Sequence, residues 1–243
     1  MERTLKVMTL DAKKSGFFKT IIINVLTLLS MFCLVYAIDK IYKFGANIDI
    51  PCMMITVIPY LLIINFSVSL GEEFTNKTDK IVFTGMFKRD EIIVSKLISF
   101  CIMSIVMFLL YDIIFIVFNV FIGKNLSEVL TFGNLFKNIY VFLIYSFTLG
   151  AFSLLVSSIT EKGMFTGIVT YIMYFDVTLL VMSQALYSSK NQLLKTVISN
   201  CPFYIANTGF RIQRYTLNQS LIMIVSGIVF LGLTIFVINK KDM

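Results

Sequence analysis

The sequence predicts an all-α integral membrane protein with six transmembrane helices, and three observations lead to this fold class. The chain has 243 residues, 58% of them hydrophobic and only 14% charged, whereas a soluble domain carries about a quarter charged residues. The apolar residues fall in blocks of about 18 or more, long enough to cross ~30 Å of hydrocarbon as helices. The alternating segments of about ten residues that a β-barrel needs do not occur. We therefore predict one transmembrane domain over residues 1–243.

The first segment, residues 1–19, is predicted to be an amphipathic helix on the cytoplasmic membrane surface. Leu5, Met8 and Ala12 recur at helical spacing. Basic residues lie between them, as is typical of a helix that contacts lipid headgroups.

Six apolar blocks follow, and each is predicted to be one span. They cover residues 20–38, 52–71, 92–119, 139–159, 165–186 and 219–238. The fourth block carries a stripe of small residues, and a GxxxG pair stands near the start of the fifth. These residues are Ser146, Gly150, Ser153 and Ser157 in the stripe, and Gly163 and Gly167 in the pair. Small side chains let helices approach closely, so both patterns predict packing seams.

The connections are short, except for the loops at about 72–91 and 187–218. The second of these contains an apolar stretch at 193–198 and then Asn200-Cys201-Pro202-Phe203. We expect short helices there that dip toward the membrane surface.

The basic residues predict the orientation, because cytoplasmic loops carry an excess of lysine and arginine. With a cytoplasmic N-terminus, 13 of the 21 basic residues lie inside and 8 outside. We therefore predict a multi-pass protein of the cell (plasma) membrane, bacterial, with both termini cytoplasmic. The same charges flank apolar blocks instead of forming a soluble basic face, which argues against a nucleic-acid partner and indicates contact with membrane lipid.

Several enzymatic functions are excluded by missing residues. The chain has no histidine, which removes His-based metal sites and the commonest general base. The four cysteines form no CxxC pair, and no metal site is predicted. No Gly-x-x-x-x-Gly-Lys-Ser/Thr phosphate loop is present, so we expect no ATP hydrolysis by this chain.

Two aspartates, Asp112 and Asp176, fall inside predicted spans. A charge at membrane depth is costly, so such residues face a partner or a wet cavity. They can serve a transport pathway or proton relay, or they can make a structural hydrogen bond to a neighbouring helix. Asp176, with Asn65 and Ser67, is a candidate for a translocation path.

The loop between the second and third spans carries the most specific pattern in the sequence. Two acidic residues open it, a mixed apolar and charged segment follows, and a run with Gly85, Arg89, Ile92 and Lys96 leads into the third span. The acidic pair is Glu72 and Glu73, and the mixed segment consists of Thr78, Asp79, Lys80, Ile81, Val82 and Phe83. This loop resembles that of type-2 ABC transporter permeases, whose first inner loop has a similar Gly-x-x-x-Arg-x-x-(apolar)-x-x-x-Lys run.

The resemblance extends to the layout of the whole chain, with its surface helix, six spans and a proline-bearing segment before the last span. The size is also similar to that of small bacterial permeases for antimicrobial-peptide resistance and lantibiotic immunity. The resemblance implies an export permease that pairs with a second permease subunit, the same or a homologous chain. It also implies cytoplasmic ABC ATPase subunits, which bind ATP and Mg.

In that family the inner loop forms a coupling helix that docks in a groove of the ATPase, so the resemblance implies a coupling helix between the second and third spans. The resemblance therefore assigns ATPase coupling to Glu72, Glu73, residues 78–83, Arg89 and Lys96. An amphipathic loop of this kind has apolar anchors suited to a groove. The main alternative is a proton-coupled secondary transporter that uses Asp112 or Asp176. A membrane-embedded enzyme is the weakest candidate, because the required histidines and motifs are missing.

Overall fold

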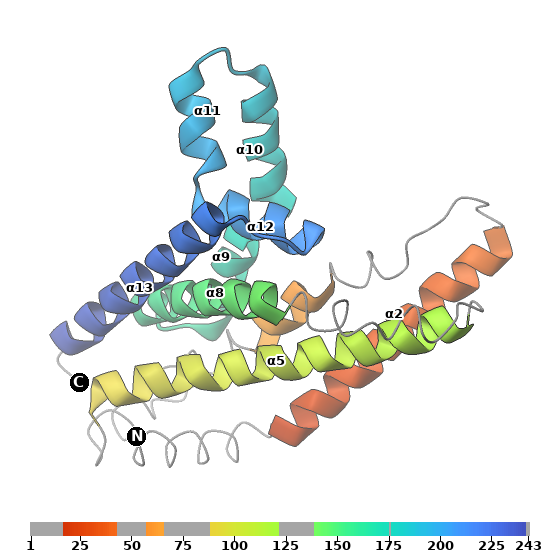
Figure 1. Cartoon of the computed structure of the whole chain (residues 1–243). Helices are drawn as coiled ribbons and strands as arrows, with labels where there is room; N and C mark the ends of the chain where they lie inside the picture. The colour runs from red at the N-terminus through yellow and green to blue at the C-terminus, as the bar shows by residue number, and fades with distance from the viewer. Residues whose placement is uncertain (1–16, 43–56, 66–87, 122–138, 175, 242–243) are drawn as a thin grey trace.

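The structure is a computed structural model that describes residues 17–42, 57–65, 88–121, 139–174 and 176–241 (Figure 1). All regular elements in these ranges are helices, which confirms the predicted all-α class for this part of the chain. The helices are α2 (Phe17–Tyr42), α5 (Arg89–Phe121), α8 (Ile139–Thr160), α9 (Gly163–Tyr174), α10 (Asp176–Ser188), α11 (Gln192–Ser199), α12 (Pro202–Ile212) and α13 (Leu217–Lys240). A further helical segment covers residues 57–65.

Four stretches are long and apolar enough to cross a membrane. They lie in α5 (Arg89–Val117), in α8, over α9 and α10 (Gly163–Ser188) and in α13. These correspond to the third, fourth, fifth and sixth predicted spans, and they support a multi-pass membrane protein. The fifth runs over α9 and α10, which are separated only by residue 175, outside the described residues.

The first predicted span lies in α2, and its stretch Lys19–Met31, over which every side chain is described, is apolar. Of the second, 52–71, only the helical segment 57–65 is described. The predicted surface helix at 1–19 and the coupling helix before α5 lie almost entirely outside the described residues.

Helix α8 is the central helix of the bundle. It packs against α5, α9, α12 and α13 (Figure 1). Inside the molecule, 67% of its span is buried, against 19–33% for the other three spans. The predicted stripe explains this position: Ser146, Ser153 and Ser157 are buried. A Cβ on Gly150 would lie 2.6 Å from a ring carbon of Phe100 in α5, so only glycine allows this approach.

A tight turn reverses the chain between α8 and α9. Glu161 has a φ of 56°, a left-handed conformation that ends α8. Helix α9 then returns along α8, and the hydroxyls of Thr160 and Thr166 lie 3.1 Å apart. The face of α9 toward the interior repeats every four residues and consists of Thr166, Thr170 and Tyr174. Gly163 and Gly167 are only half-buried, so the predicted GxxxG seam is not the contact with α8.

The long loop before the last span contains two short helices, α11 and α12, as predicted. Helices α10 and α11 form a hairpin that projects from the other helices in Figure 1. None of the residues of α11 is buried. Helix α12 instead packs against α8, α9 and α13, so it enters the bundle more deeply than a helix that dips to the surface.

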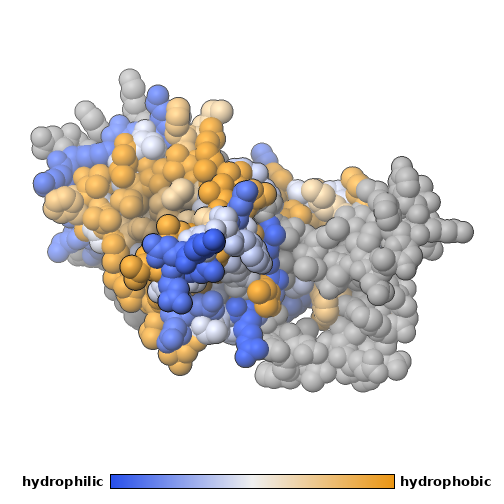
Figure 2. Space-filling view, turned by 90° about the horizontal axis from the view of Figure 1, so that it is seen from above, coloured by the Kyte–Doolittle hydropathy of each residue, from blue (hydrophilic) through white to orange (hydrophobic). Residues whose placement is uncertain are grey.

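The surface of the described helices is mostly apolar. Figure 2 shows broad hydrophobic areas, with hydrophilic residues gathered in separate patches. Exposed leucine, isoleucine and valine side chains line α5 and α13, including Ile113, Val225 and Ile228. Contiguous apolar surface of this extent is unusual for a soluble monomer and suits a helix that faces lipid.

Candidate functional site

The structure describes only part of the predicted site. The coupling residues Glu72, Glu73 and 78–83 lie outside the described residues, as does the path candidate Ser67. Asp176 begins α10, and its side chain is likewise not described. Arg89, Lys96 and Asn65 are described, and the structure does not bring Arg89 and Lys96 onto one exposed surface.

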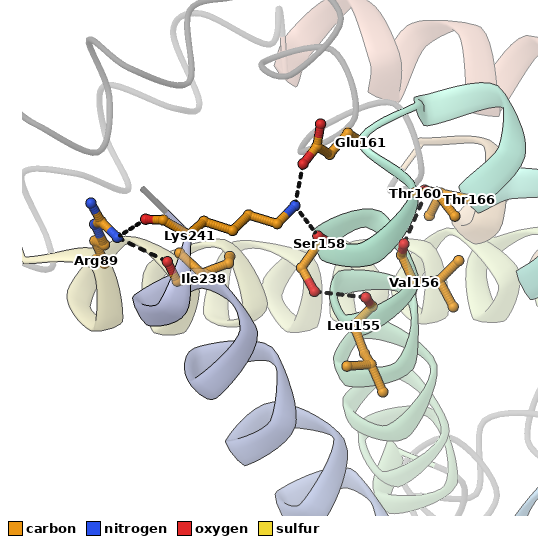
Figure 3. A network of polar contacts seen from close by, with 9 residues as sticks. All are labelled: Arg89, Leu155, Val156, Ser158, Thr160, Glu161, Thr166, Ile238 and Lys241. Carbon is orange, nitrogen blue, oxygen red and sulfur yellow. Dashed lines mark hydrogen bonds and ion pairs between the residues drawn. The ribbon is translucent and has the colours of Figure 1, made fainter. Parts of the chain in front are cut away.

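Arg89 begins α5 and bonds to the end of α13. Its guanidinium Nη1 donates to the backbone oxygens of Ile238 at 2.9 Å and Lys241 at 3.0 Å (Figure 3). The last carbonyls of a helix have no partner within the helix, so a cation at this point satisfies them and opposes the negative end of the helix dipole. Nearby, the Asn239 amide donates to Asp90 Oδ1 at 3.1 Å. We call this place, where α5 begins and α13 ends, the Arg89 end of the bundle.

Lys241 extends the same junction to α8 and α9. Its Nζ donates to the backbone oxygen of Ser158 at 2.5 Å and forms an ion pair with the Glu161 carboxylate. In Figure 3 the backbone oxygen of Lys241 faces Arg89, while its side chain points the opposite way, to the α8–α9 turn. Four helix ends therefore meet through a few polar contacts.

Lys96 belongs to the interior of the chain. This residue is 4% exposed. It shares the buried face of α5 with Ile92, Ile93 and Leu97. A side chain in this position is not part of a docking surface in the described structure.

Asn65, a predicted path residue, makes a bond between helices. Its Nδ2 donates to Oδ1 of Asn24 in α2 at 3.2 Å. Asn24 is 1% exposed, and its own Nδ2 has no partner among the described residues. An interhelical amide bond of this kind holds α2 against the segment 57–65.

Asp112 lies near the end of the bundle opposite Arg89. Its neighbour Tyr111 has its ring 6.3 Å from that of Phe142, the fourth residue of α8. One turn before Asp112, Phe108 also contacts Phe142, with 5.0 Å between the rings. Asp112 is therefore level with the start of α8 and not with its middle.

An aromatic cluster that sequence reasoning missed seats α12. The ring of Phe152, in the middle of α8, lies 5.1 Å from Phe203 at the start of α12, 5.6 Å from Tyr174 and 5.3 Å from Phe230 of α13. Phe210, at the other end of α12, contacts Tyr145 with 4.3 Å between the rings. Helix α12 therefore starts at the level of the middle of α8 and runs back toward the start of α8.

The chain after α12 is anchored to it by one tyrosine. The hydroxyl of Tyr215 donates to the backbone oxygen of Ala206 at 3.1 Å, and burial raises the pKa of this hydroxyl. A Cβ on Gly209 would lie 2.0 Å from the ring of Tyr215, so the ring can rest on α12 only at a glycine. Thr216 then caps α13 by accepting a bond from the Gln219 N–H at 3.3 Å, which explains why this helix begins two residues before the predicted 219.

Two lysines at the Arg89 end rest on aromatic rings. Lys162 Nζ is 5.8 Å from the ring centre of Phe165, and Lys240 Nζ is 4.6 Å from that of Phe236. Both phenylalanines are more than half exposed. A lysine whose charge lies beyond an exposed apolar ring is typical of a helix end at a membrane boundary.

The comparisons with known proteins give no match: no protein-family model and no curated protein matches the chain. Function therefore has to be argued from the residues. Among the described residues, no three His, Cys, Asp or Glu side chains lie together as a metal site would need. The described part offers a polar junction of helix ends around Arg89 and a buried aromatic cluster around Phe152.

Proposed function

We propose that this chain is the membrane-spanning permease subunit of an ATP-driven ABC exporter. It moves an amphipathic peptide or drug out of the membrane or the cytoplasm, a substrate class that rests on the family resemblance and the size of the chain. ATP and Mg bind to a separate ATPase chain. The permease itself supplies the helices and the inner loop on which the ATPase acts.

One observation carries this proposal. The loop that resembles a coupling segment leads directly into Arg89, and Arg89 bonds to the end of α13. Through Lys241, α13 also contacts the turn between α8 and α9. A partner that moves this loop would thus act on four predicted spans at one place.

The proposed orientation places the Arg89 end in the cytoplasm. Lys88, Arg89, Lys162, Lys240 and Lys241 all lie at or next to this end. An excess of basic residues is the usual mark of the cytoplasmic side. This is also the side on which an ATPase meets its permease.

A second permease subunit and membrane lipid would cover the exposed apolar faces. Helix α9 presents Met164, Phe165, Ile168 and Ile172 on the side away from α8. A face of this kind suits either lipid or another apolar helix. Both the same chain and a homologous chain fit the proposal.

The test is a pull-down of the tagged full chain in mild detergent, followed by an assay of ATP hydrolysis. We expect a stoichiometric ATPase to co-purify, and we expect Lys80→Glu to release it. Lys80 is a better site than Arg89 for this test, because Arg89 also holds α13. Lys190→Glu, a charge reversal between α10 and α11, is the matched control and should leave the complex intact.

A wild-type chain that is active without an ATPase would overturn the proposal. The proton-coupled alternative would then gain support, and Asp176→Asn should abolish transport driven by a proton gradient. Asp112 supports this alternative less, because it is level with the start of α8 and not with mid-membrane depth.

A further inference from the structure

Lys241 takes part in two connections at once, one through its backbone and one through its side chain. Arg89 holds the backbone oxygen of Lys241, with 3.0 Å between the atoms. The Lys241 ammonium in turn holds Ser158 at the end of α8 and Glu161 in the turn that leads to α9. Arg89 is thereby connected to the α8–α9 turn through Lys241 (Figure 3).

The stability that this connection adds is small. The side chains of Lys241 and Glu161 are 23% and 55% exposed, and ion pairs on a surface contribute little to stability. The contacts are nonetheless directional. Charged donors reach the carbonyl oxygens of Ile238 at the end of α13 and of Ser158 at the end of α8, and the Ile238 oxygen also accepts the backbone N–H of Lys241 at 3.3 Å. Such charge-assisted bonds have narrow geometry.

The α8–α9 turn is short. It contains only Glu161 and Lys162 between two helices, and Glu161 is in the left-handed conformation. The contact of Lys241 with the Glu161 carboxylate therefore connects α13 to the point where α9 leaves α8. Helix α9 in turn carries Thr166, Thr170 and Tyr174 in the interior.

We propose that Lys241 and Glu161 are positioning residues that transmit a displacement of the start of α5 to the α8–α9 turn. The source of the displacement, a partner ATPase acting on the inner loop, rests on the proposed function. The connection from Arg89 through Lys241 to Glu161 does not, and it can be tested without a partner.

The first experiment measures hydrogen–deuterium exchange of the full chain in detergent. The Glu161 N–H bonds to Ser157 O at 3.0 Å and the Thr166 N–H to Lys162 O at 3.0 Å, so both amides report on the turn. We expect Arg89→Gln to raise exchange in peptides over residues 158–166 by about three- to tenfold, the effect of losing about one hydrogen bond. Lys241→Gln should produce a similar rise.

Asn239→Ala is the matched control. It removes the bond to Asp90 at the same junction but leaves both atoms of the Arg89–Lys241 contact in place. Exchange over 158–166 should stay at the wild-type rate. Unchanged exchange in Arg89→Gln would overturn the connection, and so would an equal rise in Asn239→Ala, which would indicate general loosening of the junction.

The second experiment uses the complex with the co-purified ATPase. Lys241→Gln should keep the ATPase bound and active but lower the amount exported per ATP hydrolysed. Full export by this variant, despite faster exchange at the turn, would overturn the role in transmission. Failure of the wild-type chain to bind an ATPase would instead refute the proposed function, while the exchange rates would still decide whether Arg89 controls the turn.

Discussion

Truncation of Phe152 to alanine should loosen the packing of α12 in the bundle. Phe152 contacts three rings that come from three different helices, those of Tyr174, Phe203 and Phe230. Each aromatic pair contributes about 0.5–1.5 kcal/mol beyond burial, so Phe152→Ala should cost ~1.5–4.5 kcal/mol. Lipid is as apolar as the side chain, so we count packing only and leave out the transfer of phenylalanine from water.

The assay is equilibrium unfolding in mixed micelles of SDS and a mild detergent, followed by circular dichroism. Phe165→Ala is the matched control, because Phe165 is 55% exposed and its ring lies beside the Lys162 ammonium. The free energy of unfolding of this control should fall by less than about 1 kcal/mol, the size of an exposed cation–π contact. Equal losses for Phe152→Ala and Phe165→Ala would refute the inference that the cluster seats α12 inside the bundle.

Two further experiments test single contacts. Gly209→Ala should destabilise the chain by ~1–3 kcal/mol in the same unfolding assay, because the new methyl group would overlap the ring of Tyr215. Gly232→Ala, whose Cβ would meet nothing within 4 Å, should instead stabilise α13 by up to about 1 kcal/mol, and a loss as large as that of Gly209→Ala would contradict the packing argument. A double-mutant cycle of Asn24→Ala and Asn65→Ala should give a coupling energy of ~0.5–1.5 kcal/mol, and additive losses would show that the two amides do not interact across the helices.

Much of the helical layout was predictable from the sequence, because hydropathy depends on local composition. Four of the six predicted spans coincide with stretches long and apolar enough to cross a membrane. The stripe around Gly150 also indicated the most buried helix, since small residues at offsets of four and three form one continuous face.

The polar junction was not predictable, because it depends on residues far apart in the chain. Arg89 and Lys241 are separated by 152 positions, and only the register of α5 against α13 brings them together. The sequence had singled out Arg89 through the family resemblance, whereas Lys241 was only one of the charges of the C-terminal tail. The left-handed backbone of Glu161 also has no marker in the sequence, because glycine is the usual residue in that conformation.

The loop before α13 shows how apolar content alone can mislead. The apolar stretch at 193–198 forms α11, none of whose residues is buried. The buried helix is α12, which places Ile205, Ala206 and Phe210 on one face. The apolar residues of α11 also share one face, so what separates the two helices is the packing of α12 against α8, α9 and α13.

The length of α5 has a consequence for the way this protein responds to its lipid. Helix α5 has 33 residues and α13 has 24, so at 1.5 Å per residue they measure ~50 Å and ~36 Å. Arg89 fixes the start of α5 to the end of α13, so the difference of ~14 Å accumulates at the other end of α5. There α5 has to tilt or to project beyond the hydrocarbon, and a thicker bilayer would relieve that mismatch. The acyl-chain length of the lipid should therefore change the tilt of α5. Because α5 is one continuous helix of about nine turns, this change of tilt would also act on the contact of Arg89 with α13.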